Sequence, residues 1–514
     1  MNNKKIIAYD LGTGGIKASL FDTDGLSHAS TFRQYETQYA GADFHEQAPE
    51  DWWNGIIDST KLLLKKTKAN PDDIIGLAIS GHSLAVVPID VDGHLLRDSI
   101  PIWSDTRATA QTKSFFDKVS YEDWYMNTGN GFPAECYSIF KIMWYRDNEP
   151  EIFSKIGTVL GSKDYCNFRL TGNIMTDNSY ASGSGVYSLK NRTYVPEYID
   201  AAGIDATILP DILPSHAVVG NLTTEASKLL GLSTDVKVIC GGVDNACMAL
   251  GAKGIEDSRV YTSLGSSSWI AVISKEPILD FQYKPFVFDH CIEGLYASAT
   301  SIFSAGNSFR WVRDILCSEL LDKEKRGEIE DAYIEMNKSL EHSPIGANKL
   351  IFNPSMAGGA MIEESKDIVA GFVGLTLAHN KDDLIRSAME GITFNLKYAM
   401  NILSKYHPAL NEMLLTGGGS KSPGWRQMFA DIFGIKMIKT NIDQDAASLG
   451  AAALVAYGLG YWNDYSKIDE LHNIDSISEP AKENTKKYDK LYPIHREVAH
   501  YLALTGMHLH KLEL

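Results

Sequence analysis

The stretch DLGTGGIKASLFDTDG, residues 10–25, decides how this chain begins to fold. Apolar residues precede Gly12 and follow Gly15, and the stretch ends in an Asp-Gly pair, which predicts two strands joined by a glycine-rich hairpin. A P-loop or a dinucleotide-binding loop would instead lead from a strand into a helix. The expected anion binder is therefore a nest of backbone N–H groups, helped by the hydroxyl of Thr13, and a plain hairpin turn is the alternative.

The composition is that of a soluble globular protein with more than one domain. A chain of 514 residues is too long for one hydrophobic core, and its 44% apolar and 22% charged residues are ordinary proportions. The net charge of −17 opposes binding to nucleic acid or to an anionic membrane. The most apolar late segment, residues 450–460, is shorter than the ~20 residues that span a bilayer. The six cysteines form no CxxC pair and no zinc-like cluster, so we expect buried, reduced thiols in a cytoplasmic protein.

The opening pattern recurs near the middle of the chain. Residues 259–274, RVYTSLGSSSWIAVIS, again predict a strand, a turn of small residues and a second strand. Each of these strand–loop–strand units begins one half of the chain, which predicts two domains, 1–253 and 254–514. No low-complexity linker separates the halves, so we expect domains that pack closely and hinge.

The second half contains a further glycine-rich junction. EMLLTGGG, residues 412–419, predicts a strand that ends in glycines, and Ser422-Pro423 predicts the start of a helix, with serine as N-cap and proline as first helical residue. A longer helix is expected over residues 382–400, where apolar residues share one helical face. The glycines let a flat base or a sugar approach the backbone closely, and an ordinary strand–helix turn is the alternative.

Two aspartates stand where strands are expected to end. Asp10 ends the first strand, where its carboxylate can orient a water-bound Mg²⁺ that neutralises phosphate charge. Asp244, in CGGVDNAC, follows two glycines and stands beside Asn245. Phosphoryl transfer needs a carboxylate that takes the proton of the acceptor hydroxyl, and Asp244 fits that role by its location. The alternative for an aspartate at a strand–helix junction is a helix N-cap.

Taken together, these motifs resemble those of the FGGY carbohydrate kinases, in the sugar kinase/actin/Hsp70 superfamily. AGFVGLTLAHNKDDLIRSAME, residues 370–390, is similar to the C-terminal signature of the family, and SIFKIMWYRDN, residues 138–148, keeps Lys141 and Trp144 of the N-terminal signature. DLGTGGIKA resembles the first phosphate motif, SLGSS the second and LLTGGGSKSPGWRQMFADIFG the adenosine motif. FHEQAPEDWW and IWSDTRA also resemble family segments, so the resemblance runs along nearly the whole chain.

The resemblance implies two actin-like (ribonuclease H-like) α/β domains, each a mixed sheet flanked by helices, with a cleft between them for ATP and Mg²⁺. It implies phosphoryl transfer from ATP to a sugar or polyol hydroxyl, with Asp244 as the catalytic base and with Asp10 and Asp244 tied to Mg²⁺ through water. The residues that it assigns to the nucleotide are Thr13, Gly14, Gly15, Lys17, Gly265, Ser266, Gly418, Gly419 and Ser422. The residues that it assigns to the sugar are His82, Ser83, Trp103, Asp105, Arg107 and Asn245.

Two departures from the family pattern bear on the acceptor. Many xylulokinases carry a Gly-Gln-Met-His run where this chain has Gly81-His82-Ser83-Leu84, so Leu84 stands in place of a sugar-contacting histidine. His82 either compensates for that histidine, which requires the backbone to re-aim it, or packs at a strand end. The Gly-Glu-Arg-x-Pro run that is frequent in the family is absent from residues 353–367.

The resemblance therefore predicts a sugar kinase with a ketopentose such as xylulose as its acceptor. Gluconate, erythritol or another polyol are the alternatives within that class. From a different class, a non-catalytic ATP-binding module of the actin and Hsp70 type is the alternative, although such proteins need a partner-binding surface or an appended domain. A sugar-responsive regulator would need a basic patch or an extra helix-turn-helix segment, and neither is recognised in this sequence. Homodimers are common in the family, and a homodimer is a further expectation.

Overall fold

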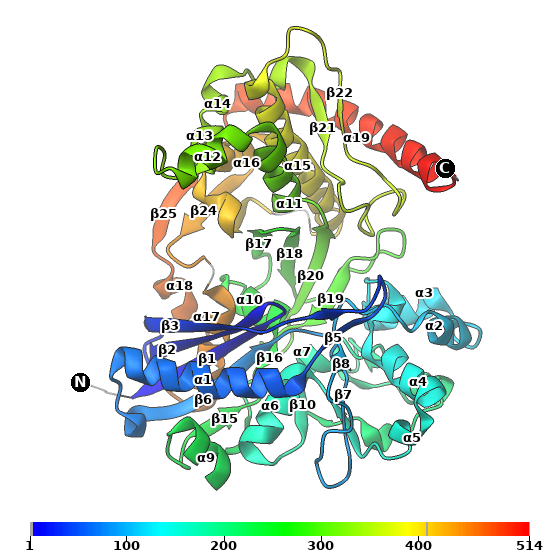
Figure 1. The fold of residues 1–514 in the computed structure, drawn as a ribbon, viewed down its shortest axis with the longest axis vertical. Coiled ribbons are helices and arrows are strands. Elements are labelled where there is room, and N and C mark those ends of the chain that lie inside the picture. Colours follow the sequence, from blue (N-terminus) through cyan, green and yellow to red (C-terminus); the bar gives the residue numbers. More distant parts are fainter. Residues whose placement is uncertain (1–3, 408–409, 444, 513–514) are drawn as a thin grey trace. The chain divides into compact units, whose positions relative to one another are not determined.

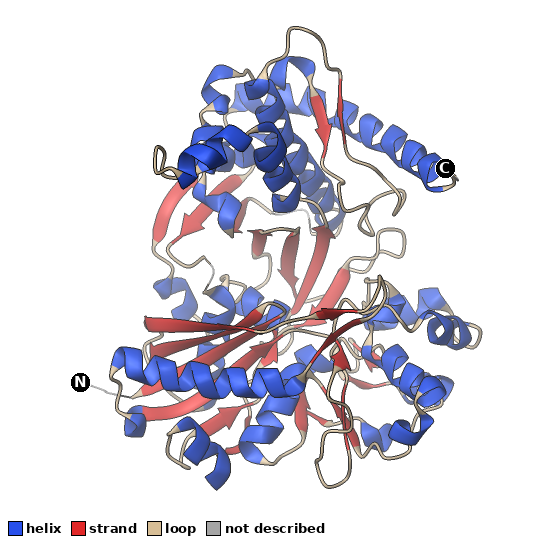
Figure 2. Cartoon of the chain, viewed as in Figure 1, coloured by secondary structure: helices blue, strands red, loops and turns tan. Residues whose placement is uncertain are grey.

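The computed structural model describes residues 4–407, 410–443 and 445–512. The chain forms two compact units, and each is built from several segments of the sequence. The first unit contains Met1–Asp257, Ile273–Ser298 and Asp445–His472, and the second contains Ser258–Val272, Ala299–Gln444 and Asn473–Leu514. Figure 2 shows red strands and blue flanking helices in both units. The expected division at residues 253 and 254 stays a prediction.

The first unit is organised around a mixed sheet (Figure 1). Its path is β14-β15-β6-β1-β2-β3, and β16 also pairs with β6. β1 pairs in parallel with β6 and antiparallel with β2, so the expected strand–hairpin–strand opening is confirmed. The strands are β1 (Lys5–Gly12), β2 (Gly15–Asp22), β3 (Ser27–Gln34), β6 (Ile74–Gly81), β14 (Val218–Asn221), β15 (Lys237–Ile239) and β16 (Gly242–Val243).

Helices cover both faces of this sheet. Tyr9 of β1 points toward α1 (Pro49–Thr67), where its hydroxyl lies 2.6 Å from Thr60 Oγ1. Gly76 of β6 lies so close to α17 (Ala446–Gly458) that an added Cβ would be 2.7 Å from a Val455 methyl carbon. Gly76 is the register partner of Ile6, three residues before Tyr9, so these contacts lie on opposite faces of the sheet. Burial on both faces explains why residues 6–9 of β1 form a continuous buried run rather than an alternating pattern.

The second unit contains most of a second seven-stranded sheet, whose order is β19-β20-β18-β17-β23-β24-β25. β17 and β23 are neighbouring parallel strands, and β17 forms an antiparallel hairpin with β18. The repeated strand–turn–strand pattern is therefore confirmed. The strands are β17 (Val260–Leu264), β18 (Ser268–Ser274), β19 (Phe286–Asp289), β20 (Tyr296–Ile302), β23 (Glu412–Thr416), β24 (Lys436–Thr440) and β25 (Ile474–Ser478).

The predicted helices of the second half are confirmed, and their caps follow the sequence. α15 (Lys381–Ser404) begins with a capping box in which Asn380 accepts the backbone N–H of Asp383 and the Asp383 side chain accepts that of Asn380. α16 (Pro423–Phe433) begins after Ser422, whose hydroxyl accepts the N–H of Trp425. It ends at Gly434, which takes the left-handed conformation with φ 72°.

The remaining strands and α-helices complete both units. The other strands are β4 (Gln38–Tyr39), β5 (His45–Gln47), β7 (Val87–Ile89), β8 (Ile100–Pro101), β9 (Thr158–Leu160), β10 (Met175–Asp177), β11 (Tyr187–Ser188), β12 (Thr193–Tyr194), β13 (Asp211–Leu213), β21 (Ile351–Asn353) and β22 (Gly371–Val373). The other α-helices are α2 (Thr109–Phe116), α3 (Tyr121–Thr128), α4 (Ser138–Asn148), α5 (Pro150–Phe153), α6 (Ser162–Thr171), α7 (Asn178–Ala181), α8 (Pro196–Ala202), α9 (Thr224–Leu230), α10 (Asp244–Gly251), α11 (Gly306–Trp311), α12 (Ser318–Lys325), α13 (Ala332–Asn337), α14 (Ser339–His342), α18 (Lys467–Leu471) and α19 (Lys482–His510).

Two expectations from composition are tested directly by the structure. All six cysteines are buried free thiols, as expected. Across residues 4–407, 410–443 and 445–512, no helix has both the length and the apolar character needed to cross a bilayer.

Candidate active site

The first phosphate motif is the tight hairpin that joins β1 to β2. Gly12 and Gly15 are register partners, so Thr13 and Gly14 form the tip. A Cβ on Gly14 would meet nothing within 4 Å, whereas a Cβ on Gly15 would be 2.4 Å from the carbonyl oxygen of Arg33. Glycine is therefore required at Gly15 for packing, while the exposed tip at Gly14 leaves the backbone open to a ligand.

Side chains distant in sequence hold this hairpin in place. Gln47 Nε2 donates a 2.7 Å hydrogen bond to the carbonyl of Thr13, and Gln47 Oε1 accepts a 2.9 Å bond from Trp52 Nε1. Trp103 Nε1 donates to Thr13 Oγ1 at 2.9 Å, and the hydroxyl of Tyr35 donates to the carbonyl of Gly12. No role for Gln47 was predicted, although it lies in the family-like segment FHEQAPEDWW, because hydrogen bonds between residues far apart in the chain leave no local pattern.

Lys17 points to a carboxylate that the sequence analysis missed. Its ammonium group forms an ion pair with Asp445, the residue directly before α17. Lys17 is also the register partner of Asp10 across the β1–β2 ladder. A cation is thus placed beside the hairpin, with its charge opposed by Asp445 in this structure.

Asp10 and Asp244 flank the carboxyl end of β6. Asp10 is the register partner of Ser80, whose hydroxyl donates a 3.4 Å hydrogen bond to its carboxylate. Gly242 of β16 pairs with Ser80 from the other side, and Asp244 begins α10 two residues later. Carboxyl ends of parallel strands are where α/β proteins gather functional side chains, and here two carboxylates meet.

The environment raises the pKa of both carboxyl groups. Burial, together with the nearby charge of Asp10, raises the pKa of Asp244 to about 7, and the hydrogen bond from the backbone N–H of Asn245 opposes that shift. Burial also raises the pKa of Asp10 to about 6, against the charge of Lys17 and the hydrogen bond from Ser80. A carboxyl group with a pKa near neutrality is suited to accept a proton at physiological pH.

The alternative of an N-cap role for Asp244 is wrong. The N-cap of α10 is Val243. The Asp244 carboxylate accepts a 2.8 Å hydrogen bond from the backbone N–H of Asn245, the next residue. The side chain of Asp244 therefore does not cap the helix. The carboxylate is partly exposed and stands beside Asp10, as a reactive group would.

His82 lies in the core rather than at the surface. Its side chain is 1% exposed and packs edge-on against Trp52, with ring centroids 5.1 Å apart. Among the described residues, neither ring nitrogen has a hydrogen-bond partner, and burial lowers the pKa of the ring to about 4. The following Ser83 is 8% exposed, and Leu84 is buried with a positive φ of 61°.

The other residues expected at the sugar form a buried charged cluster. Arg107 Nε lies 2.9 and 3.0 Å from the two carboxylate oxygens of Asp105, and its Nη2 lies 2.7 Å from both Asp105 and Glu46. Asp105 also accepts the backbone N–H of His45 at 2.8 Å. Much of the hydrogen-bonding capacity of Arg107 is therefore used within the protein, and Trp103 is the member of this group with substantial exposure, at 40%.

Lys141 of α4, the lysine of the predicted N-terminal signature, supports this region. Its ammonium group is fully buried and donates to the carbonyl of Leu84 at 3.1 Å and to that of Ile102 at 2.5 Å. These carbonyls directly follow Ser83 and precede Trp103 in the chain. The signature lysine thus ties together two segments that carry predicted sugar residues.

In the second unit, both predicted nucleotide motifs meet at the ends of adjacent strands. The turn after β17 contains Gly265 and Ser266, and the loop after β23 begins at Gly417, where a Cβ would be 2.7 Å from the carbonyl of Leu264. Gly418 follows with nothing within 4 Å of its Cβ position, while the Cβ position of Gly419 lies 3.1 Å from a Leu264 side-chain carbon. The second phosphate turn and the adenosine loop are therefore neighbours within this unit.

The start of α11 completes the second phosphate turn and was missed by the sequence analysis. Gly306 N–H donates to the carbonyl of Gly265 at 3.0 Å, and Asn307 N–H donates to that of Ser266 at 3.0 Å. Ser422 is committed to the fold, because it caps α16 and donates to Asn337 Oδ1 at 3.0 Å. Ser422 thus shapes the loop, and Gly418 is its most open glycine.

The segment that lacks the Gly-Glu-Arg-x-Pro run docks on α19. Glu363 lies 3.5 Å from Arg496 Nη2 and accepts a 3.2 Å hydrogen bond from Asn395. Burial raises the pKa of Glu363, and the charge of Arg496 opposes that shift. This departure from the family pattern therefore has its own set of contacts in the second unit.

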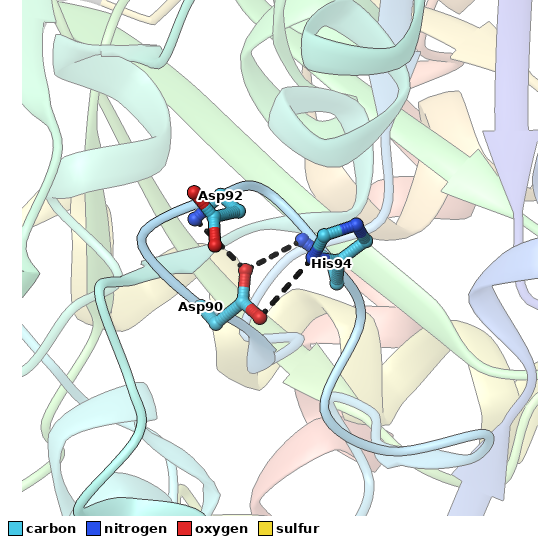
Figure 3. A group of neighbouring side chains, drawn as sticks. All are labelled: Asp90, Asp92 and His94. Carbon is cyan, nitrogen blue, oxygen red and sulfur yellow. Dashed lines mark hydrogen bonds and ion pairs between the residues drawn. The ribbon is translucent and has the colours of Figure 1, made fainter.

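A different acidic group lies in the turn after β7. Asp90, Asp92 and His94 place possible metal-ligating atoms within 4.8 Å of one another, the one such group among the described residues (Figure 3). The Asp90 carboxylate accepts the backbone N–H groups of Asp92 at 2.9 Å and of His94 at 2.8 Å. These hydrogen bonds explain why the three side chains lie together: Asp90 stabilises the turn that contains all of them.

Comparison with known proteins gives consistent matches along the chain. Residues 5–251 match the model of the N-terminal domain of the FGGY family of carbohydrate kinases, and residues 260–459 match that of its C-terminal domain. Xylulose kinase of Bacillus subtilis (strain 168) is 30% identical over 496 residues, which cover 96% of each chain. Gluconokinase of Bacillus licheniformis is 26% identical over 490 residues, covering 95% of this chain and 94% of the relative.

Solved structures match the fold equally well. Ligand-bound xylulose kinase from Lactobacillus acidophilus superimposes with a TM-score of 0.89 at 27% identity, covering 98% of this chain and all of that one. Gluconate kinase from the same organism gives a TM-score of 0.89 at 27% identity, covering 98% and 99% of the two chains. The expected architecture of actin-like domains with mixed sheets flanked by helices is confirmed.

Proposed function

The chain belongs to the FGGY family of carbohydrate kinases and is itself a carbohydrate kinase that uses ATP, and from that premise we propose that it phosphorylates a ketopentose such as xylulose, with Asp244 as the general base. The observation that carries the assignment of the base is the meeting of Asp10 and Asp244 at the end of β6, with the pKa of Asp244 raised to about 7. The named relatives favour the ketopentose.

In this mechanism Asp244 accepts the proton of one sugar hydroxyl while the oxygen of that hydroxyl attacks the terminal phosphorus of ATP. The bond from phosphorus to the bridging oxygen breaks, and ADP leaves. The hairpin residues Thr13 and Gly14 lie by the transferred phosphate, and Lys17 offsets its negative charge. Gly15 keeps the hairpin tight, and Asp10 stays ionised beside the base.

Magnesium fits the two carboxyl groups. The mutual repulsion of Asp10 and Asp244, visible in the raised pKa of Asp244, leaves negative charge that a divalent cation would offset. Asp10 and Asp244 would hold the ion through water. When bound, Mg²⁺ neutralises charge on the phosphates of ATP.

On the nucleotide side, we assign Gly265 and Ser266 to the phosphates of ATP. The open glycine of the adjacent loop, Gly418, together with Gly419 and Ser422, is assigned to the adenosine. The support is their meeting at the ends of the neighbouring strands β17 and β23.

On the sugar side, we assign Trp103 and Asn245 to direct contacts, because Trp103 is exposed and Asn245 adjoins the base. Asp105 and Arg107 act through their ion pair, which shapes the segment that bears Trp103. His82 and Ser83 lie on the other segment that Lys141 holds, and their side chains require a local rearrangement to reach a ligand because both are buried.

Gluconate is the second candidate acceptor, because gluconokinases are among the relatives. A sugar acid needs a cation for its carboxylate. Arg107 is paired with Asp105 and Glu46, and Lys141 is bound to two carbonyl groups, so the cations of the predicted sugar region are engaged within the protein. This favours an uncharged acceptor over gluconate, with erythritol and other polyols behind the ketopentose.

The partners and location follow as parts of the same proposal. The ligands are small molecules, and the net charge of −17 opposes nucleic acid as a partner. We place the enzyme in the cytoplasm, where ATP and sugar acceptors are available, and expect a homodimer. Size-exclusion chromatography with light scattering measures the oligomeric state, and a monomer at micromolar concentration contradicts that part.

The experiment is ADP release from ATP·Mg²⁺ with a matched panel of xylulose, ribulose, gluconate, erythritol and glycerol. We expect xylulose to give the highest kcat/KM and Asp244→Ala to lower kcat at least 10³-fold while ATP still binds. A higher kcat/KM for gluconate would reassign the acceptor. Sugar-independent ATP binding with no acceptor-stimulated ADP release would support the non-catalytic module, and an active Asp244→Ala variant would show that another group is the base.

A further inference from the structure

Residues 240–243, which directly precede Asp244, form a tightly packed segment, called here the passage. Gly241 has a φ of 76°, and a Cβ there would be 2.1 Å from the carbonyl oxygen of Ile79. A Cβ on Gly242 would be 2.6 Å from Cys291 Sγ. The path of the backbone into Asp244 is thus fixed by close contact, and small errors in it have no empty space in which to relax.

Buried polar side chains form hydrogen bonds with the backbone at both ends of this passage. At its start, the carbonyl of Cys240 accepts a 2.8 Å hydrogen bond from Asn167 Nδ2 and a 3.3 Å bond from Lys163 Nζ. At its end, the backbone N–H of Val243 donates a 2.9 Å bond to Ser179 Oγ. Val243 is the residue directly before Asp244, so Ser179 holds the Gly242–Val243 peptide group, one residue before the base.

Ser179 is itself held by a buried carboxylate. Its hydroxyl donates a 2.5 Å bond to Asp177 Oδ2, which also accepts a 2.6 Å bond from the hydroxyl of Ser215. Lys163 Nζ lies 3.0 Å from Asp177 Oδ1. The backbone N–H of Gly241 donates to the carbonyl of Ser215 at 3.0 Å, so this network reaches the passage a third time.

The network is buried, which favours a fixed geometry. Lys163, Asp177, Ser179 and Ser215 are all at most 2% exposed. Burial alone would lower the pKa of Lys163, but the carboxylates of Asp164 and Asp177 outweigh burial and raise that pKa well above its ordinary value. A buried, hydrogen-bonded ion pair holds its hydrogen-bond acceptors in one orientation.

We propose that Ser179, oriented by Asp177, is a positioning residue for phosphoryl transfer, because it fixes the Gly242–Val243 peptide group, one residue before the Cα from which the Asp244 carboxylate projects. The inference rests on the proposed role of Asp244 as base. Ser179 touches neither reactant in this account. Its effect is on where the carboxylate stands relative to the acceptor hydroxyl, so it acts on turnover rather than on ATP binding.

The test is Ser179→Ala, with Ser182→Ala as its matched control. Ser182 is equally buried and belongs to the same segment, but its hydroxyl donates to the carbonyl of Ser179 at 2.7 Å and accepts the N–H of Asp289, with no bond to residues 240–244 in the described contacts. Steady-state kinetics with ATP and the best acceptor give kcat and both KM values. Hydrogen exchange reports the protection of the Val243 amide.

For Ser179→Ala we expect kcat to fall about 10–100-fold with the KM for ATP within about twofold, and the Val243 amide to exchange faster. Ser182→Ala should keep kcat within about threefold. Unchanged kcat in Ser179→Ala, or an equal loss in both variants, would overturn the inference. If Ser179→Ala does not fold, Ser179→Cys replaces it. Because a thiol is a weaker hydrogen-bond acceptor, we expect a smaller loss of kcat, and an unchanged kcat would again overturn the inference.

The two proposals fail in distinguishable ways. If Asp244→Ala retains activity, the assignment of the base fails, whatever Ser179 does. If Asp244→Ala is inactive and Ser179→Ala turns over at the wild-type rate, the base stands and only the positioning role is lost.

Discussion

Trp103 donates a 2.9 Å hydrogen bond to Thr13, so a residue assigned to the sugar is joined directly to the tip of the hairpin assigned to the phosphate. Both substrates must be aligned for an in-line displacement. A single hydrogen bond between their two binding elements gives the protein a direct way to couple the two positions.

This coupling is tested by a double-mutant cycle of Trp103→Phe and Thr13→Val. Each single change removes the hydrogen bond, so we expect each to lower kcat/KM for the sugar about 5–10-fold. The kcat/KM of the double variant should be little lower than that of the less active single variant. The coupling free energy should be about 1 kcal/mol. Additive losses in the cycle would mean that the bond contributes nothing to catalysis.

Lys17 is expected to stabilise charge in the transition state. Lys17→Met should lower kcat about 10²-fold or more, because one cationic donor to a transferring phosphoryl group is lost. Lys17→Arg should recover part of that loss. Lys66→Met, which removes an exposed lysine that bonds the carbonyl of Ser30 from α1, is the control and should leave kcat unchanged. A Lys17→Met enzyme with normal kcat would remove Lys17 from the mechanism.

The raised pKa of Asp244 predicts the acid side of the pH profile. The base must be ionised, and below its pKa of about 7 the ionised fraction falls tenfold per pH unit. We therefore expect kcat/KM to decline below about pH 7. Return of full activity when the sample is brought back to pH 8 separates titration from acid unfolding. A profile that stays flat down to pH 5 would contradict the assigned pKa.

The same shift predicts that catalysis is maintained at the expense of stability. The Asp244 carboxyl group has a pKa of about 7 when folded and an ordinary value of 3.8, so between these values the folded state binds more protons than the unfolded state. Stability therefore falls as pH rises toward 7. Asp244→Asn cannot ionise, so we expect its Tm to exceed that of the wild type by about 2–4 °C at pH 8 and by much less at pH 5.

Differential scanning fluorimetry measures these Tm values. Asp205→Asn is a control of opposite sign, because hydrogen bonds from Thr207 lower the pKa of Asp205, and its loss should decrease the Tm at pH 8. An Asp244→Asn advantage that is the same at both pH values would show that charge is not its cause.

Gly417 predicts a selective loss of nucleotide affinity. Its φ of 84° disfavours other residues, and a Cβ would lie 2.7 Å from the Leu264 carbonyl, next to the second phosphate turn. Gly417→Ala should raise the KM for ATP about tenfold or more. Gly434→Ala is matched in φ, at 72°, but its Cβ would meet only a methyl group at 3.7 Å, so it should lower the Tm and leave the KM for ATP unchanged. Equal KM values in both variants would contradict the role of the adenosine loop.

Local patterns predicted the elements well, because their causes are local. Ser422-Pro423 starts a helix through one hydroxyl and one fixed φ, and the β1–β2 hairpin follows from two apolar runs around glycines. The position of Asp244 was also predictable, since glycines and a strand precede it. Its pKa was not, because that depends on burial and on Asp10, which is more than two hundred residues away.

The partners of these motifs escaped prediction for the same reason. Asp445 reaches Lys17, and Gln47 reaches Thr13, only after the sheet has formed. The environment of His82 could not be predicted from its sequence position either. Its position at a strand end was compatible with either a ligand contact or simple packing, and the fold places it against Trp52, in the packed arrangement.

The interleaved segments of the first unit have a consequence for synthesis on the ribosome. Helix α17, which packs on β1 and β6, is translated only after most of the second unit. Its fit is close, since a Cβ on Gly450 would lie 2.0 Å from the carbonyl of Cys247 in α10. Until those residues emerge, one apolar face of the nascent sheet has no cover, which leaves the growing chain dependent on chaperones or prone to aggregate.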